Sequence, residues 1–448
     1  MIMSGRISKR TIAFAAAVLI SAVCSVGAGA QAYGSYTPYS FFGVGDLFSQ
    51  GTAYNRSMGG VGVATRSTRF INPVNPAAVT ARDSLAFMAD FSLYGDNKVF
   101  RQGDMKSASN TFNIGDLIIS FPIWKSSAMM VGLMPYSSTG YGYKYSIDDD
   151  NIIGKTGDIV YAATGQGALY QAFAAAGVTF FDRISLGAQV NYIFGQTDKK
   201  FYETFANASF NGANNGFNLQ LNGVSGKFGI QYEQPLGAKS KLTVGATYAM
   251  DTPMNGYVEG YKFSAGTAAS DTLYYKLDTL SAANGKVRLA SEIGVGINFK
   301  YGDQFMAEFD YSRSDWTTSG MSVTQGFMGN INPSATHSAF SANVSESYRF
   351  GMEYVPNRND IRYFWKKCAY RAGAYYKNEY YLLDGHDVTS MGITLGTTLP
   401  IFRWSNGLTL GIDFGQRGSM TDNMIRERYF NFSVGAPFAL CEEIVACE

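Results

Sequence analysis

The sequence has few charged residues, and this shortage excludes one large class of function. Charged residues make up 16% of the 448 positions, and the formal net charge is +1. A nucleic-acid-binding protein concentrates lysine and arginine on one surface to contact the phosphates, and this composition does not supply such a surface. We therefore expect no nucleic-acid partner.

Catalytic and metal-binding patterns are also scarce. The two histidines, His337 and His386, fall in expected outer loops without a serine or cysteine in a triad setting. The acidic run 148–150 lacks the spacing of a calcium loop, so a solvated acidic loop is the simpler interpretation. No phosphate loop or dinucleotide fingerprint stands out. We expect a protein that is not an enzyme and that holds no cofactor and no metal.

Cysteine and long apolar runs are rare as well. Only Cys368, Cys441 and Cys447 follow the N-terminal region, and an odd, irregular set is neither a disulfide framework nor a zinc site. Cys441 and Cys447 either bridge within the tail or remain plain residues. The one long apolar run follows a basic start and ends in small residues, which predicts a cleaved signal peptide over residues 1–32 and export. A retained anchor is the alternative.

Aromatic residues and glycine, in contrast, are abundant. Aromatics make up 15% of the chain, and there are 50 glycines. From residue 85 onward, apolar and polar residues alternate with a period of two, as they do in β-strands. In the segment 287–300, "VRLASEIGVGINFK", Val287, Leu289, Ile293 and the alternate positions after them share one apolar face. This composition fits strands that have one face against lipid.

Loop lengths favour a membrane barrel over a soluble sandwich. Tight connectors near 181–184, 237–241, 301–304 and 402–407 alternate with long polar stretches at 148–166, 264–285 and 319–345. Short turns at one end and long loops at the other are typical of bacterial outer-membrane barrels. We predict about fourteen antiparallel transmembrane strands, near residues 85–94, 111–122, 128–146, 167–181, 184–204, 216–235, 241–263, 286–300, 304–319, 346–356, 368–383, 387–400, 407–417 and 426–438.

Charged residues within these strands are expected to face the lumen, because a charge that faces lipid costs a few kcal/mol near the midplane. Strand parity predicts a lumen charge network of Asp90, Glu292, Glu308, Asp310, Arg349, Glu353, Arg371 and Asp413. The mixed signs favour ion pairs that clamp a plug inside the barrel. A polar path for solutes is the alternative.

Residues 33–83 have no strand pattern, although their many apolar side chains are unusual for a solvated tail. They include the glycine-rich run with Gly59, Gly60 and Gly62, and then two Asn-Pro steps that end at Asn75-Pro76-Ala77. Proline cannot continue a helix or a central strand, so these steps predict a stiff turn before the wall. The all-β chain then divides into a signal peptide (1–32), a hatch or plug (33–83), the transmembrane β-barrel (84–438) and a tail (439–448).

Asn75-Pro76-Ala77 before the first strand, with "SMGGVGVA" upstream, resembles the outer-membrane long-chain fatty-acid transporters, the FadL-like barrels that include toluene transporters. The versions "YSFFGVGDL" and "NRSMGGVGVA" look like those of Bacteroidota. In this family a short N-terminal hatch plugs a fourteen-stranded barrel, and the third strand has an inward kink. Pro135 and Gly140 are the matching candidates for a kink and a lateral opening, with a simple bulge as the alternative.

The resemblance implies passive uptake of hydrophobic, fatty-acid-like molecules in the bacterial outer membrane, by a hatch-gated and lateral route. The partners would be outer-membrane lipids and hydrophobic small molecules. The alternative is a non-transporting barrel subunit of a larger outer-membrane secretion or barrel-assembly complex, which would contact other outer-membrane proteins. An apolar tunnel in the lumen favours uptake, whereas a salt-bridged plug favours the subunit.

Overall fold

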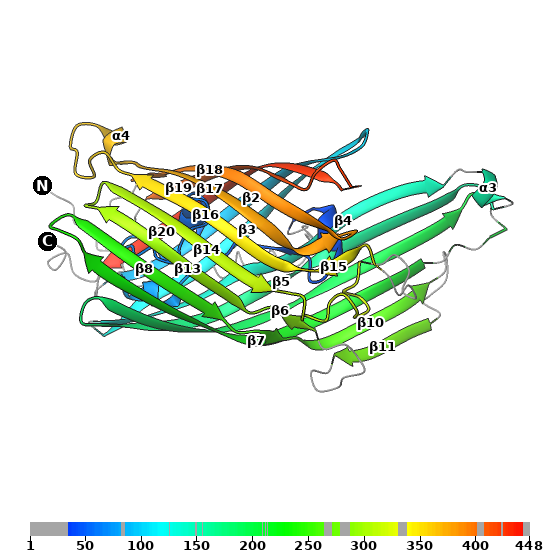
Figure 1. Cartoon of the computed structure of the whole chain (residues 1–448), viewed down its shortest axis with the longest axis horizontal. Coiled ribbons are helices and arrows are strands. Elements are labelled where there is room, and N and C mark those ends of the chain that lie inside the picture. The colour runs from blue at the N-terminus through cyan, green and yellow to red at the C-terminus, as the bar shows by residue number, and fades with distance from the viewer. Residues whose placement is uncertain are drawn as a thin grey trace, which may run out of the picture. The chain divides into compact units, whose positions relative to one another are not determined.

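The computed structural model describes residues 35–81, 86–124, 126–147, 150–154, 156–207, 209–210, 212, 214–263, 271–277, 287–329, 338–400, 407–422 and 424–441. Within these ranges the chain forms a closed antiparallel barrel of 14 strands, as the sequence predicts (Figure 1). The expected signal peptide, His337 and Cys447 lie outside the described residues. No described helix has the length and apolar character that crossing a membrane requires.

The wall strands follow one another around the ring, and the last strand pairs with the first. They are β2 (Ala86–Gln102), β3 (Met105–Trp124), β4 (Ser127–Ile147), β5 (Ile159–Phe180), β6 (Ile184–Phe205), β7 (Asn214–Pro235), β8 (Ser240–Ala249), β13 (Glu292–Tyr301), β14 (Phe305–Asp315), β16 (Val344–Tyr354), β17 (Ala369–Leu383), β18 (His386–Leu399), β19 (Leu408–Arg417) and β20 (Arg426–Cys441). Shorter pieces extend some of them: β9 (Thr252–Pro253), β10 (Asn255–Phe263), β11 (Asp271–Leu277), β12 (Arg288–Leu289) and β15 (Phe340–Ala342).

The two ends of the barrel differ. Strands β4 to β7, with β10 and β11, extend well beyond the other strands toward α3 (Asp150–Ile153), as Figure 1 shows. We call this the extended-strand end. The opposite, short-turn end carries the β14–β16 pair Phe305–Tyr354 and the loop 355–368, which contains α4 (Phe364–Lys367). In the circuit of described strands, this loop is longer than the tight turns expected at that end.

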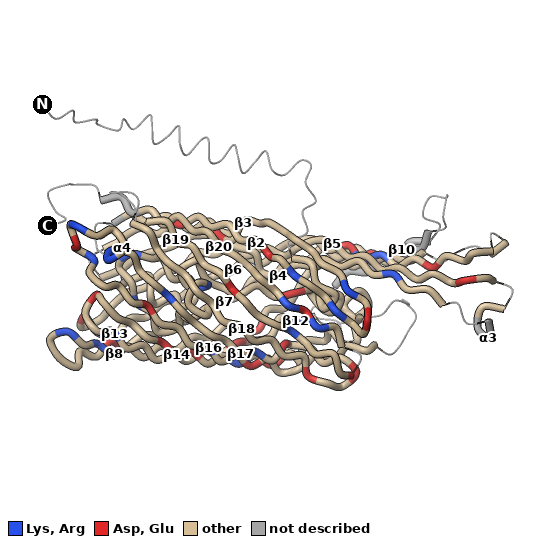
Figure 2. Tube along the Cα trace, turned by 90° about the horizontal axis from the view of Figure 1, so that it is seen from above, with Lys and Arg blue, Asp and Glu red and all other residues tan. Residues whose placement is uncertain are grey.

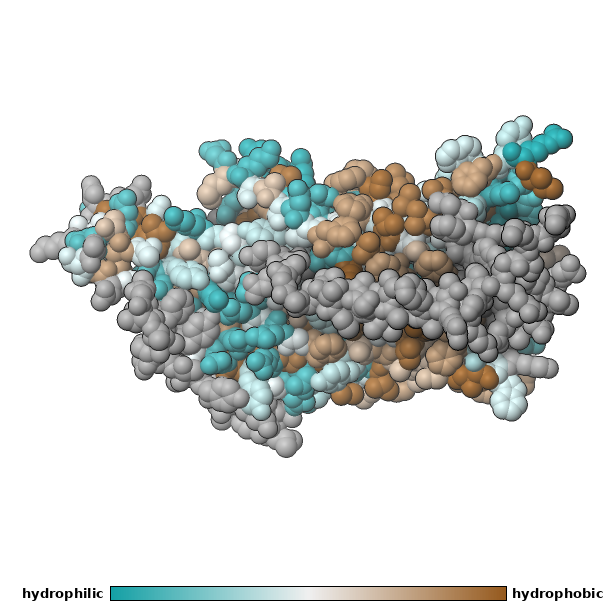
Figure 3. Space-filling model, turned by 180° about the vertical axis from the view of Figure 1, so that it is seen from behind, coloured by the Kyte–Doolittle hydropathy of each residue, from teal (hydrophilic) through white to brown (hydrophobic). Residues whose placement is uncertain are grey.

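The wall has the predicted alternation, with one correction. Ile293, Val295 and their alternate neighbours on β13 are exposed, and Figure 3 shows hydrophobic side chains gathered over the middle of the visible wall. Val287 and Leu289 are instead buried at 1% and 2% exposure, so their predicted place on the same apolar face is wrong. The chain leaves the wall ladder between β12 and β13, which breaks the phase of the alternation.

Several predicted boundaries also shift. Strands β2 and β3 are longer than the predicted ranges 85–94 and 111–122. They remain paired as far as Gln102 and Met105, and Gly103, with φ of +55°, turns the chain between them. Strand β11 lies inside a stretch expected to be a loop, and β5 begins at Ile159, within another. Strand β20 continues to Cys441, so the expected tail begins inside the strand.

Charged residues are sparse along the wall, and both signs are interspersed (Figure 2). The segment before the wall, residues 35–81, contains η2 (Pro38–Phe41), β1 (Asp46–Leu47), α2 (Ala53–Arg56) and η3 (Pro76–Ala81). It bonds with inward side chains or backbone of strands around the whole ring, among them β3, β4, β7, β14 and β18. A segment with such partners must lie inside the ring, and we call it the luminal segment.

Candidate functional site

Two buried carboxylates on β14 hold the centre of the luminal segment. Asp310 Oδ2 accepts the backbone N–H groups of Gly62 and Val63, at 2.7 and 3.0 Å. Glu308 Oε1 accepts those of Ala64 and Thr65, at 2.9 and 3.1 Å. Four consecutive backbone donors are thus satisfied by the oxygens of two buried carboxyl groups. If the segment moved away, its four donors and Asp310 Oδ2 would lose these partners, and Glu308 would keep only its hydrogen bond from Asn298 among those described.

The Asn75-Pro76-Ala77 turn is fixed from both sides. The fully buried Asn75 amide donates to the Val63 carbonyl at 2.7 Å and to the Ile230 carbonyl of β7 at 3.3 Å. Its Oδ1 accepts the Ala77 N–H at 3.0 Å, which closes an Asx turn at the start of η3. Asn75 therefore links the turn to the glycine-rich run and to the wall.

The glycine-rich run needs glycine for backbone conformation and for close approach. Gly59 has φ of +68°, and its N–H donates to Thr394 Oγ1 of β18 at 2.7 Å. On the wall, a Cβ added at Gly245 would lie 2.2 Å from the Val63 carbonyl oxygen. Main chain therefore packs directly on main chain at this point of the lumen.

Two further clusters tie α2 to the wall. Arg56 forms an ion pair of 2.9 Å with Asp116 of β3, and the buried Asp90 of β2 lies in the same cluster. On the other side, the Arg371 guanidinium lies 4.4 Å from the ring centroid of Tyr54 and forms an ion pair of 2.8 Å with Glu353. These contacts combine charge pairing with cation–π packing.

Toward the extended-strand end, the lumen is filled by an apolar core. Its larger members are Tyr39, Phe41, Phe42, Tyr141, Phe201, Phe217, Phe327, Tyr380 and Tyr381. Lys199 ends in this core, where its ammonium donates to the carbonyls of Phe41, Gly43 and Gly326 at 3.0, 3.2 and 2.9 Å. One buried ammonium therefore joins β6, the luminal segment and the β14–β15 connection.

Along its length, strand β4 pairs first with its wall neighbour β3 and then with the luminal segment. Pairing of β3 with β4 runs only from Leu117–Trp124 against Ser127–Leu133. Beyond it, β4 has a register shift against β5 at Pro135, and Ser137 and Ser138 pair with β1. The Gly140 carbonyl accepts the Thr37 N–H at 2.7 Å. The sequence-predicted Pro135 and Gly140 thus flank the stretch of β4 that bonds to the luminal segment.

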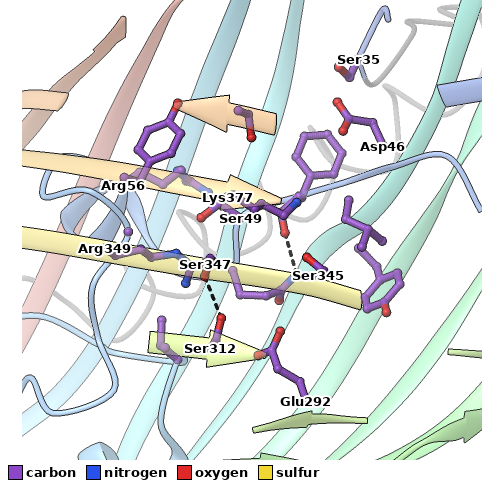
Figure 4. A pocket seen from close by; sticks show the side chains of 18 of the residues that line it. Ser35, Asp46, Ser49, Arg56, Glu292, Ser312, Ser345, Ser347, Arg349 and Lys377 are labelled. Carbon is purple, nitrogen blue, oxygen red and sulfur yellow. Dashed lines mark hydrogen bonds between the residues drawn. The ribbon is translucent and has the colours of Figure 1, made fainter. Parts of the chain in front are cut away.

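A cavity of about 350 Å³ lies between the luminal segment and the wall, and its lining is rich in charged, hydroxyl and amide side chains (Figure 4). At one side, Arg417 forms ion pairs with Asp46, Glu379 and Glu427 at 2.9, 3.2 and 3.7 Å. Lys98 joins the same cluster at 3.6 Å from Asp46 and 3.5 Å from Glu427. The cavity therefore has clustered charges at this side, within a lining that also includes apolar side chains such as Ile193 and Leu289.

A family model described as BamG matches residues 10–440. The chain belongs to the BamG family. A search of curated proteins finds no match.

Among solved structures, this BamG-family barrel is similar to the toluene transporter TodX of P. putida, with a TM-score of 0.55, 14% identity and coverage of 89% of this chain and 98% of the other. It is also similar to the Ralstonia pickettii toluene transporter TbuX, with a TM-score of 0.55, 15% identity and coverage of 86% and 97%. It is similar to a Pseudomonas aeruginosa FadL homologue as well, with a TM-score of 0.55, 10% identity and coverage of 88% of this chain and 98% of the other. At such identities the likeness establishes the fold.

The structure does not join the predicted lumen charges of this BamG-family chain into one network. Glu308 with Asp310, Glu353 with Arg371, and Asp90 with Asp116 form separate clusters around the luminal segment. The remaining three predicted residues line the cavity: Glu292, Arg349 and Asp413.

Sequence reasoning missed Lys199, Asp46, Lys98, Arg417 and Glu427, which carry much of the buried charge. Strand parity contained a signal for Lys199, because it alternates with the buried Thr197 and Phe201 on β6. Arg417 is the last residue of the predicted strand 407–417 and has the parity of Asp413, so parity contained a signal for it as well.

Proposed function

We propose that this protein is a plugged, non-transporting barrel subunit of a larger outer-membrane assembly, for secretion or barrel assembly. The observation that carries the proposal is the seat of the luminal segment, where Glu308 and Asp310 accept four consecutive backbone N–H groups. The barrel fold, its apolar outer face and its likeness to transporter barrels support an outer-membrane location. Nothing in this role requires catalysis.

The two halves of the lumen argue against a route for hydrophobic molecules. Toward the extended-strand end, close-packed aromatic side chains fill the space that a hydrophobic ligand would occupy. Toward the luminal segment, paired charges and hydroxyl groups stand among the apolar side chains that line the cavity. A hydrophobic molecule there would break hydrogen bonds and ion pairs without replacing them, which is costly in a low-dielectric site.

A subunit of an assembly also needs a contact surface, and the loop 355–368 supplies one at the short-turn end. Its Ile361, Tyr363 and Trp365 side chains are 95%, 58% and 68% exposed. Asp360 Oδ1 accepts the N–H groups of Tyr363 and Arg362 at 2.7 and 2.8 Å, and these hydrogen bonds lower the pKa of Asp360. The loop thus has an internally bonded structure while it exposes apolar side chains. Figure 1 shows its α4 at one end of the barrel.

The proposal is tested by purification of the full chain from native membranes in mild detergent, together with conductance measurements in planar bilayers. We expect closed channels and partner proteins at fixed stoichiometry. The paired variant Ile361→Ser with Trp365→Ser should lose the partners, whereas Phe181→Ser, at another exposed turn tip, should retain them. A monomeric protein with open channels would contradict the proposal.

Uptake of hydrophobic, fatty-acid-like compounds by a lateral route is the second candidate, and the seam between β3 and β4 favours it. The paired stretch Leu117–Trp124 spans about 19 Å of the membrane normal at about 3.3 Å per residue and a tilt of about 45°, short of a hydrocarbon core of about 30 Å. In the outer part of the wall, β3 and β4 are therefore not paired with each other. If cells that lack the protein accumulate a fluorescent fatty acid at an unchanged rate, this candidate is excluded.

A further inference from the structure

The cations that line the lumen cavity fall into two groups. Arg56, Lys98, Lys377 and Arg417 each form an ion pair with a carboxylate. Lys227 of β7 and Arg349 of β16 also line the cavity, and neither forms a hydrogen bond or an ion pair with any described residue. Lys227 is only 9% exposed. A largely buried ammonium that no protein group accepts in a hydrogen bond is unfavourable, because burial removes part of its hydration.

These two cations lie within electrostatic range of each other, on different strands of the wall. Arg349 also lies against the luminal segment, since a Cβ added at Gly60 would stand 3.7 Å from the Arg349 Cδ. Two like charges held together in a partly buried space repel each other. The arrangement therefore stores an unfavourable interaction that an anion between them would remove.

Polar groups beside the two cations complete a cradle. Ser345, Ser347 and Ser312 lie near Arg349 (Figure 4), and the Ser312 and Ser347 hydroxyls are 2.7 Å apart. Across the cavity, the buried amides of Gln189 and Asn191 share the lining with Lys227. Hydroxyl and amide donors suit an oxyanion, and the guanidinium fork of arginine matches the geometry of phosphate and carboxylate.

Two carboxylates face the same cations and limit the charge of the ligand. Glu292 lines the cavity in an exposed position and interacts electrostatically with Lys227. Asp310 interacts with Arg349, but its Oδ2 is already engaged by Gly62 and Val63. These carboxylates offset the formal charge of the two cations, which leaves room for one small oxyanion at most and disfavours a polyanion such as a nucleoside triphosphate.

We propose that Lys227 and Arg349 form a luminal binding site for one phosphate-like oxyanion. The cavity of about 350 Å³ is at the small end of ligand sites, which span about 300–1,000 Å³. The bound anion links β7 to β16 across the luminal segment and strengthens its seat. This inference does not depend on whether the barrel conducts or has partner proteins.

The test uses the full chain in detergent, with inorganic phosphate against chloride at constant ionic strength. We expect the Tm to rise with phosphate in a saturable manner. Lys227→Met and Arg349→Met should each weaken phosphate binding at least tenfold. Without phosphate, Lys227→Met should have a Tm equal to or above that of the parent chain, because it removes an unpartnered buried charge. Lys106→Met, at an exposed position of β3, is the control and should bind phosphate normally.

A short-chain phosphatidic acid forms the second arm and distinguishes a lipid headgroup from free phosphate as the source. The site is supported if either probe binds the parent chain saturably and if Lys227→Met and Arg349→Met both lose this binding. The proposal is overturned if neither probe stabilises the parent chain, or if the variants bind both probes as well as Lys106→Met does. A Lys227→Met chain that is strongly destabilised without ligand would also contradict it, since Lys227 would then have a structural partner.

Discussion

Removal of the Asp310 carboxylate tests how firmly the luminal segment is seated. Asp310→Ala eliminates the acceptor of the Gly62 and Val63 N–H groups, which lie 2.7 and 3.0 Å from Oδ2. A hydrogen bond to a charged group contributes about 1.5–3 kcal/mol, so the pair contributes about 3–6 kcal/mol before relaxation. Water from the adjacent cavity can replace part of this. We therefore expect a net loss of about 2–4 kcal/mol for local opening.

Hydrogen–deuterium exchange of peptides that cover residues 58–66 measures this local opening directly. When closing is faster than exchange, a loss of about 2 kcal/mol accelerates exchange about 30-fold, and larger losses accelerate it further. Asp315→Ala on the same strand is the matched control, because Asp315 is exposed and bonds only within its own turn to Thr317. Exchange in Asp310→Ala within threefold of the control would refute the assignment of Asp310 as a clamp.

Three further substitutions test other contacts of the luminal segment. Asn75→Ala with Pro76→Ala should lower the Tm and raise bilayer conductance, because it removes the bonds to Val63 and the wall; if the Tm, conductance and uptake are all unchanged, the turn has no role in seating the plug. Gly245→Ala should increase protease sensitivity of the luminal segment, since its Cβ would lie 2.2 Å from a carbonyl oxygen, whereas Gly237→Ala, with nothing within 4 Å, should have no effect. Lys199→Met should speed exchange around residues 41–43 by at least tenfold, which corresponds to about 1.4 kcal/mol, and unchanged exchange there would contradict its anchoring role.

The strand pattern was predictable because alternation is a local property. Each wall strand has one face against an apolar medium, so its own residues report the period and the phase without knowledge of its neighbours. Where the chain leaves the ladder, this local signal fails. In the sequence, Val287 and Leu289 continue the alternation of β13. In the structure the chain leaves the wall ladder before Glu292, so both side chains point into the apolar core.

Partners across the lumen were not predictable, because they depend on how the ring closes. Parity indicates that Glu308 and Asp310 share a face, but only the folded barrel brings residues 62–65 to them. Lys199 shows the same limit, since its partners lie on the luminal segment and at Gly326, more than a hundred positions away; so does the ion pair of Arg417 with Asp46. The single sequence therefore indicated which residues face the lumen better than it indicated which partners they bond to.

The β3–β4 seam makes the luminal segment a part of the wall. In lipid, backbone groups must find partners within the protein, because hydrocarbon offers none. Over its central stretch β4 finds them in the luminal segment, through Ser137, Ser138 and the carbonyls of Tyr136 and Gly140. Departure of the segment would leave this edge of β4 unpaired and would remove the backbone donors that Asp310 and Glu308 accept. A plug that completes the hydrogen bonding of its own barrel is costly to open for transport, and this favours a role in which the barrel remains closed.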